Sequence, residues 1–189
     1  CGAMDAPAHA PDPDAEAERL RRARRGDGAA FEALYHDHAR AVHALAFRLT
    51  GNAAEAEDIV QETFLRMFGF LSGLRENTPL RPWLKRVAAN LAIDRLRRQQ
   101  HPGTDMALAA LADPASASPA DAADADTLLR RLPPLARTVV WLHEMEGWSH
   151  EDLGRRFGRT ASWSKSLMSR SLARLRQDLD PHGDAPHDA

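Results

Sequence analysis

Residues 149–176 read SHEDLGRRFGRTASWSKSLMSRSLARLR, and this stretch decides how the C-terminal part of the chain folds. Ser149–Phe157 has the length of a short helix with serine as its N-cap, and Gly158–Thr160 is typical of a tight turn. A longer helix is predicted over Ala161–Leu175. Two helices joined in this way form a helix-turn-helix, whose second helix enters the major groove of DNA.

The stretch is basic although the chain as a whole is not. From Leu153 to Arg176 there are seven Lys or Arg residues and no Asp or Glu, whereas the formal net charge of all 189 residues is −2. The positive charge is therefore concentrated on one local surface, which favours binding to the phosphates of DNA. A helical hairpin with a solvated basic face would carry the same residues, and this stretch alone leaves that alternative open.

The periodicity of the second helix separates an outward face from an inward one. The residues that we expect against base edges and phosphates, at i, i+1, i+4 and i+5, are Lys165, Ser166, Ser169 and Arg170. The residues that we expect to hold phosphates without reading sequence are Arg155, Arg156 and Arg174. The residues of the neighbouring face, which are expected to pack inward, are Ser164, Met168, Ser171 and Leu175.

Composition places the whole chain among helical proteins. Hydrophobic residues make up 43% and aromatic residues 6%, while Ala, Leu and Arg, which favour helix, are abundant. No apolar run approaches the roughly 20 residues that span a bilayer, and no secretory signal is recognisable. We therefore expect a cytoplasmic protein without membrane insertion. Cys1 is the only cysteine, which excludes a disulfide within one chain.

The N-terminal half predicts a helical bundle. Apolar residues recur at helical spacing over Phe31–Leu49, Gly51 supplies a helix end, and Asn52 can cap the next helix. Residues 72–82 contain Gly, Asn and Pro and predict a loop. A further helix is expected over Trp83–Arg98.

Composition changes abruptly at His101. Residues 101–127 contain five Asp and no Lys or Arg, which indicates a flexible acidic linker, with one helical turn expected at Met106–Leu111. The predicted fold class is therefore all-α, with two small helical domains joined by that linker. The expected boundaries are a disordered tag and tail at 1–15, the first domain at 16–100, the linker at 101–127, the second domain at 128–179 and a disordered tail at 180–189.

A second basic segment lies at Arg81–Arg98, with six cations and one acidic residue. A basic helix that follows a polar loop suits DNA whose strands are being separated, because the cations track the backbone and the loop can hold an unstacked base. The alternative is an amphipathic helix with Trp83 in the core, and for Trp83 itself that alternative is favoured.

Catalytic chemistry has no support in the sequence. His36, His38 and His43 cluster, but their spacing on a helix does not converge on one metal ion. Neither a phosphate-binding glycine loop nor a nucleophile motif occurs. We therefore predict no enzymatic activity, no cofactor and no metal site.

Three stretches together resemble the extracytoplasmic-function (ECF) class of the bacterial sigma-70 family. Glu55–Arg66 resembles conserved region 2.2, Arg81–Arg98 resembles regions 2.3 and 2.4, and Leu132–Arg176 resembles region 4. The resemblance implies an RNA polymerase sigma factor. Such a subunit binds core RNA polymerase, recognises the −35 and −10 promoter elements, and promotes DNA melting.

The family implies roles for individual positions. The residues that match the surface of region 2.2 on the polymerase β′ clamp are Asp58, Gln61, Glu62 and Arg66. The loop that would capture a flipped base of the −10 element comprises Arg75, Glu76, Asn77, Thr78, Pro79 and Leu80. The residues of the following helix that would face −10 DNA are Lys85, Arg86, Asn90, Arg95, Arg97 and Arg98. The residues that match the −35 readers are Lys165, Ser166, Ser169 and Arg170.

The chain departs from the family pattern in the turn and on the second helix of the helix-turn-helix. The departing residues are Arg159, Trp163, Ser164 and Leu167. For Trp163, packing is favoured over contact with DNA. The resemblance therefore does not imply a promoter preference.

Two other functions compete with the sigma factor. A stand-alone helix-turn-helix regulator would not need Glu55–Arg66, and a sigma mimic that binds an anti-sigma factor would have lost the basic faces. The expected partners are core RNA polymerase (β′ clamp and β flap), promoter DNA and an anti-sigma factor, without an obligate homo-oligomer. Association with the nucleoid is expected when the protein is bound to polymerase.

Overall fold

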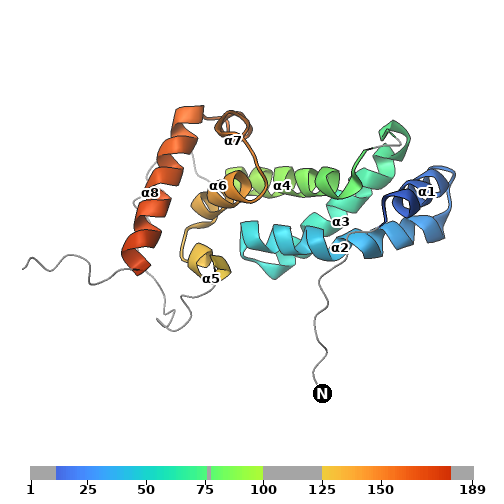
Figure 1. The fold of residues 1–189 in the computed structure, drawn as a ribbon, viewed down its shortest axis with the longest axis horizontal. Helices are drawn as coiled ribbons and strands as arrows, with labels where there is room; N and C mark the ends of the chain where they lie inside the picture. Colours follow the sequence, from blue (N-terminus) through green and yellow to red (C-terminus); the bar gives the residue numbers. More distant parts are fainter. Residues whose placement is uncertain (1–11, 76–77, 100–124, 180–189) are drawn as a thin grey trace, which may run out of the picture.

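The computed structural model describes residues 12–75, 78–99 and 125–179. Every regular element within these ranges is helical (Figure 1). The N-terminal elements are α1 (Pro13–Arg24), α2 (Gly28–Thr50), α3 (Ala53–Phe70), the 3-10 turn η1 (Leu71–Gly73) and α4 (Leu80–Gln99). The C-terminal elements are α5 (Ala125–Arg130), α6 (Pro134–Glu144), α7 (His150–Phe157) and α8 (Ala161–Leu179). The predicted all-α fold class is confirmed.

The helix ends of the N-terminal unit follow from local hydrogen bonding. Gly51 adopts the left-handed conformation with φ 72° and ends α2. The Asn52 side-chain oxygen accepts a hydrogen bond from the amide of Glu55 at 3.1 Å and so caps α3. This boundary is where the sequence predicts it.

Three predicted boundaries are wrong by a few residues. α5 begins at Ala125, inside the expected linker. α1 begins at Pro13, inside the expected tail, because Asp12 caps the helix and proline is well suited to a first helical turn. α4 begins at Leu80, inside the expected loop, and Leu80 is fully buried. Burial of that leucine offsets the poor helix propensity of Pro82 in the first turn, where proline removes no helical hydrogen bond. The helical turn expected at Met106–Leu111 lies outside the described residues.

The C-terminal unit contains the predicted helix-turn-helix in α7 and α8. The Ser149 hydroxyl accepts a hydrogen bond from the amide of Asp152 at 3.0 Å, and Gly158 ends α7 with φ 68°. A Cβ atom at Gly154 would lie 2.6 Å from the carbonyl carbon of Thr160. Only glycine therefore lets the turn approach α7 this closely.

The inward face of α8 differs from the expected one at a single position. Ser164, Ser171 and Leu175 are buried as predicted, but Leu167 is 1% exposed, whereas Met168 is half-buried. Leu167 belongs to the continuous apolar core, against which Met168 packs from the side. The helix turns this leucine inward because apolar burial stabilises by about 25 cal/mol per Å².

The two helical units pack directly against each other. α6 packs against α2 and α4, and α7 lies beside α4 (Figure 1). One continuous set of buried apolar residues runs through both units, and the Thr138 hydroxyl donates a hydrogen bond to the carbonyl oxygen of Leu49 at 3.3 Å. This closed arrangement brings together residues that lie far apart in the sequence. The exact domain boundaries stay a prediction.

Candidate DNA and polymerase surfaces

The outward face of α8 presents the predicted −35 readers. Lys165, Ser166, Ser169 and Arg170 are all exposed. Beneath them, the buried Ser171 hydroxyl donates to the carbonyl oxygen of Leu167 at 2.8 Å, and Ser164 Oγ lies 3.1 Å from His150 Nδ1. The inward serines are thus satisfied internally, and the outward ones remain available to a ligand.

The start of α8 is fixed by two contacts. The Thr160 hydroxyl accepts a hydrogen bond from the amide of Trp163 at 3.1 Å, a cap that sequence reasoning missed because Thr160 was assigned only to the turn. The rings of Trp163 and Phe157 lie 5.4 Å apart. Trp163 is half-buried against the apolar core, which agrees with the packing role favoured for it.

The three predicted phosphate ligands of the C-terminal unit have different surroundings. Arg155 is exposed and pairs with Asp152 on its own helix at 2.8 Å. Arg156 instead turns towards α4, where Nε donates to Asn90 Oδ1 at 2.6 Å and Nη2 donates to Asp94 Oδ2 at 2.9 Å. Arg174 is half-buried. Arg156 therefore joins the predicted −35 side of the molecule to the predicted −10 side.

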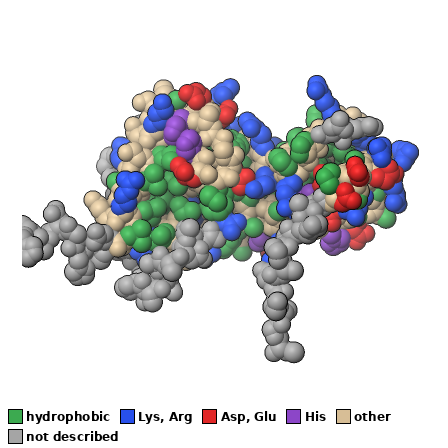
Figure 2. Space-filling model, in the orientation of Figure 1, with side chains coloured by type: hydrophobic (Ala, Val, Ile, Leu, Met, Phe, Trp, Pro, Cys, Tyr) green, Lys and Arg blue, Asp and Glu red, His purple; other side chains and the backbone are tan. Residues whose placement is uncertain are grey.

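The predicted −10 face of α4 is engaged by the chain itself. Lys85 forms an ion pair with Glu146 at 2.5 Å, and the Arg86 guanidinium lies 4.9 Å from the ring centre of Trp148. Arg97 donates to the carbonyl oxygen of Arg156 at 3.2 Å. Figure 2 shows Lys and Arg side chains, in blue, around α4 and its junction with the C-terminal unit.

Two cations near the C-terminal end of α4 have other surroundings. Arg95 turns away from the junction and donates to the carbonyl oxygen of Glu55 at 3.2 Å. Arg98 is exposed. The junction therefore engages three of the five predicted −10 cations of α4.

The predicted base-capturing loop borders a cavity of about 300 Å³. Thr78 and Pro79 line it together with Leu142 and Trp148 of the C-terminal unit. Arg75 is exposed, whereas Leu80 is buried below the loop. Glu76 and Asn77 lie outside the described residues. The closed arrangement thus places apolar side chains of the C-terminal unit beside the predicted base-capturing loop.

The predicted polymerase surface lies on α3. Asp58, Gln61 and Arg66 are exposed, and Glu62, which is half-buried, pairs with Arg66 at 2.7 Å. Asp58 also lies 3.6 Å from Arg95. The four residues share one side of the helix and present charges of both signs.

Sequence reasoning missed two apolar members of this surface. Leu65 is 70% exposed and Phe68 is 64% exposed, and their spacing from Asp58 and Gln61 places all four on one face. Exposed large apolar side chains beside charged ones are typical of protein interfaces. Their exposure could have been predicted from the sequence, since both residues lie off the apolar stripe formed by Val60, Phe64 and Met67.

Neither a metal site nor a membrane span is found in the described parts of the chain. Within residues 12–75, 78–99 and 125–179, His, Cys, Asp and Glu do not converge in groups of three that could hold a metal ion. None of the helices described there combines the length and apolar character that crossing a membrane requires.

The fold and these surfaces define a two-unit helical protein with a helix-turn-helix in its second unit. The model of sigma-70 region 2 matches residues 34–101, and that of sigma-70 region 4 matches residues 123–175. The chain is 36% identical over 168 residues to RNA polymerase sigma factor CarQ of Myxococcus xanthus, which covers 85% of this chain and 95% of that protein. It is 33% identical over 152 residues to ECF RNA polymerase sigma factor SigM of Mycobacterium tuberculosis, over 79% of this chain and 77% of that protein.

A solved structure shares the fold. The structure of CnrH in complex with the cytosolic domain of CnrY has a TM-score of 0.51 and 22% sequence identity, over 90% of this chain and 100% of that one. The chain belongs to the ECF class of the sigma-70 family of RNA polymerase sigma factors. Sigma-70 regions 2 and 4 bind core RNA polymerase and promoter DNA.

Proposed function

We propose a division of labour among the residues of this sigma factor. Exposed α8 reads the −35 element through Lys165, Ser166, Ser169 and Arg170, while the loop before α4 and the cations of α4 hold the melted −10 element. α3 docks on the β′ clamp through Asp58, Gln61, Glu62 and Arg66, with Leu65 and Phe68 beside them. The exposure of the α8 readers over a satisfied inward face supports this assignment most strongly.

We further propose that the closed arrangement keeps α4 from binding −10 DNA and opens on core polymerase. Arg156 hydrogen-bonds with Asn90 and Asp94, so these groups cannot simultaneously contact −35 and −10 DNA. The fraction of open molecules then scales the apparent affinity of the free protein for −10 DNA.

Three further assignments follow from family membership. An anti-sigma factor controls the protein, the protein acts in the cytoplasm and on the nucleoid without catalysing a reaction itself, and no obligate homo-oligomer forms. The two helical domains correspond to sigma regions 2 and 4, the first beginning with α1 at Pro13 and the second with α5 at Ala125.

Run-off transcription on a promoter library tests the function directly. Core RNA polymerase supplemented with the protein should initiate at a common pair of −35 and −10 sequences. Absence of transcription above that of core polymerase alone, despite binding of the protein to DNA, would favour a stand-alone helix-turn-helix regulator.

The α3 surface is tested by a double substitution, Asp58→Ala with Gln61→Ala. Capture of core polymerase should weaken at least about ten-fold, since interface residues that matter contribute more than 1 kcal/mol each. Binding of −35 duplex DNA should stay unchanged. The matched control is Glu32→Ala, an exposed acidic residue on α2. Equal polymerase capture by the double variant and the control would remove α3 from the interface.

A further inference from the structure

Helix α1 lies outside the surfaces proposed above to bind DNA and polymerase. The model of sigma-70 region 2 begins at residue 34, so α1 precedes the residues that it matches. Leu20 and Ala23 of α1 are buried against the bundle. Two polar side chains of the same helix, Glu16 and Arg24, reach the segment between α3 and α4. That segment contains the predicted base-capturing loop.

Arg24 holds the chain where it enters the loop. Its Nε atom donates a hydrogen bond to the carbonyl oxygen of Leu71 at 3.0 Å, and its Nη2 atom donates to the carbonyl oxygen of Leu74. Leu71 begins the η1 turn and Leu74 follows it, and both are buried. One guanidinium therefore fixes the last turn before the loop at two backbone positions, as cations commonly do at the end of a helix.

Glu16 holds the chain where it leaves the loop. The amide of Leu80 donates a hydrogen bond to Glu16 Oε1 at 3.3 Å, while Glu16 Oε2 lies 2.9 Å from Nε2 of the buried His38. Leu80 is the first residue of α4, and the preceding Pro79 has no side-chain oxygen that could cap the helix. A carboxylate from α1 thus supplies the N-terminal cap of α4, where the helix dipole also favours a negative charge.

The two anchoring residues are held apart by a regular helix. The stretch of α1 from Glu16 to Arg24 is about 12 Å long at 1.5 Å per residue. The chain from Leu74 to Leu80 would reach about 20 Å if it were extended, and it is shortened by a turn in which the amide of Thr78 donates to the carbonyl oxygen of Arg75 at 3.0 Å. α1 therefore acts on both ends of the loop at once.

We propose that Glu16 and Arg24 are positioning residues for the predicted base-capturing loop. Contacts at both ends restrict the loop before DNA arrives, so less conformational entropy is lost when a base of the −10 element enters it. This role rests on the base-capturing function proposed above. α1 thereby contributes to the selectivity of a loop that it does not form.

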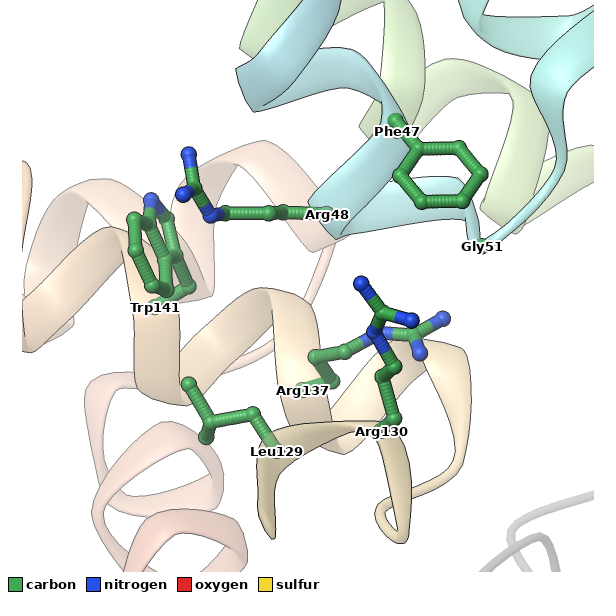
Figure 3. A pocket seen from close by; sticks show the side chains of 7 residues that line it. All are labelled: Phe47, Arg48, Gly51, Leu129, Arg130, Arg137 and Trp141. Carbon is green, nitrogen blue, oxygen red and sulfur yellow. The ribbon is translucent and has the colours of Figure 1, made fainter. Parts of the chain in front are cut away.

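These contacts belong to the N-terminal unit alone. The seam between the two units lies at the C-terminal end of α2, where Arg48 extends over the ring of Trp141 on α6 (Figure 3). α1 instead meets α2 near its middle, at Asp37 and His38. The positioning contacts therefore do not depend on the closed arrangement and persist when the units separate on core polymerase.

The test uses the complex of the protein with core RNA polymerase. Its affinity is measured for a forked promoter from the run-off library, with the −10 strand either intact or carrying an abasic site at each position in turn. The original protein should bind the intact strand more tightly than the strand that lacks the captured base. Arg24→Gln should weaken binding of the intact strand about ten-fold, since charge-assisted hydrogen bonds that shape the loop are lost. Binding of that abasic strand should stay within about two-fold, because the loop has no base to receive there.

Conservative variants separate positioning from folding. Arg24→Lys keeps the charge but lacks the planar fork that reaches two acceptors, so its selectivity should lie between those of Arg24→Gln and the original. Glu16→Gln keeps an oxygen that can accept from the amide of Leu80 and should be more selective than Glu16→Ala. The matched control Arg25→Gln removes the adjacent arginine, whose side chain is 72% exposed, and should leave both affinities within about two-fold of the original.

The outcomes distinguish this role from the proposed function. An unchanged ratio of intact to abasic affinity in Arg24→Gln overturns the positioning role alone, and so does an equal loss on both strands, which would assign Arg24 to folding or to the DNA backbone. If Arg24→Gln does not fold, equal selectivity of Glu16→Gln and Glu16→Ala has the same meaning. Equal binding of every abasic strand and the intact strand by the original protein would overturn base capture itself and the positioning role with it.

Discussion

The two predicted DNA-binding helices are in opposite situations. On α8, Lys165 and Arg170 are exposed and have no hydrogen-bond or ion-pair partner within the described residues. On α4, Lys85, Arg86 and Arg97 all contact the C-terminal unit. Both helices carry enough cations for DNA, so the difference lies in what the rest of the chain does to those cations.

This difference separates two requirements that a charged face must meet. Residue type determines whether a surface can bind phosphates, and tertiary packing determines whether it is free to do so. α8 meets both requirements in the closed arrangement, whereas α4 meets only the first. Binding of DNA by α4 therefore includes the free-energy cost of separating the two units. Substitutions at the junction should change the affinity of α4 for DNA.

The largest effect is expected from Arg170→Ala on α8. Removing a bidentate base contact should weaken binding of −35 duplex DNA by about 1–3 kcal/mol, with little change in stability because the side chain is exposed. Fluorescence anisotropy on cognate and scrambled duplexes measures the loss. An equal loss on both duplexes would reassign Arg170 to the phosphate backbone.

Arg156→Ala should affect the two surfaces in opposite directions. It breaks the hydrogen bonds to Asn90 and Asp94, which are partly exposed and contribute about 1 kcal/mol. Binding of single-stranded −10 DNA by the free protein should rise about five-fold, while −35 binding falls. The matched control is Arg155→Ala, because Arg155 pairs only within α7 among the contacts observed. A gain of −10 binding in both variants would refute the role of the junction.

A smaller effect is expected from Glu146→Gln. This change removes the ion pair that holds Lys85, and a partly exposed pair of this kind contributes roughly 0.2–1 kcal/mol. Single-stranded −10 DNA should bind about two-fold more tightly at low salt. Glu144→Gln, an exposed change two residues earlier at the end of α6, should leave the affinity unchanged. Failure of high salt to erase the difference would argue against an electrostatic origin.

The smallest effect is expected from pH and concerns the stability of the N-terminal unit. His38 is fully buried, with Glu16 Oε2 at 2.9 Å and with Arg81 and Asp37 as further charged neighbours. Burial lowers the pKa of His38 below its ordinary value of 6.5, although Glu16 acts in the opposite direction. The unfolded chain therefore binds the proton first, and the free energy of unfolding should fall as the pH drops below 6.5 towards the folded-state pKa.

Urea denaturation between neutral and mildly acidic pH measures that slope. His38→Gln should flatten it, whereas His36→Gln, an exposed change on the same helix, should not. An unchanged slope in the His38 variant would assign the pH dependence to other groups. His150 of the C-terminal unit contributes in the same direction, because burial and His143 also lower its pKa.

Much of the fold could be predicted because its signals are local. Asn52, Ser149, Gly51 and Gly158 act within one helical turn of their own positions, and each lies where the sequence predicts it. The first turn of α4 could not be predicted, because proline and glycine indicate a loop and only the burial of Leu80 in the bundle overrides them. The exposure of Leu65 and Phe68, by contrast, could have been predicted, because both lie off the apolar stripe of α3.

The sequence by itself determined the helices, their caps, the family and the two charged faces. These depend on residue type, on spacing along the chain and on hydrogen bonds over a few residues. Only the tertiary structure decided that α4 is covered while α8 is open, and that α1 holds both ends of the loop before α4. Those facts depend on contacts such as Arg156 with Asn90, which are 66 residues apart. Such pairs are set by how whole helices pack, and no local pattern encodes them.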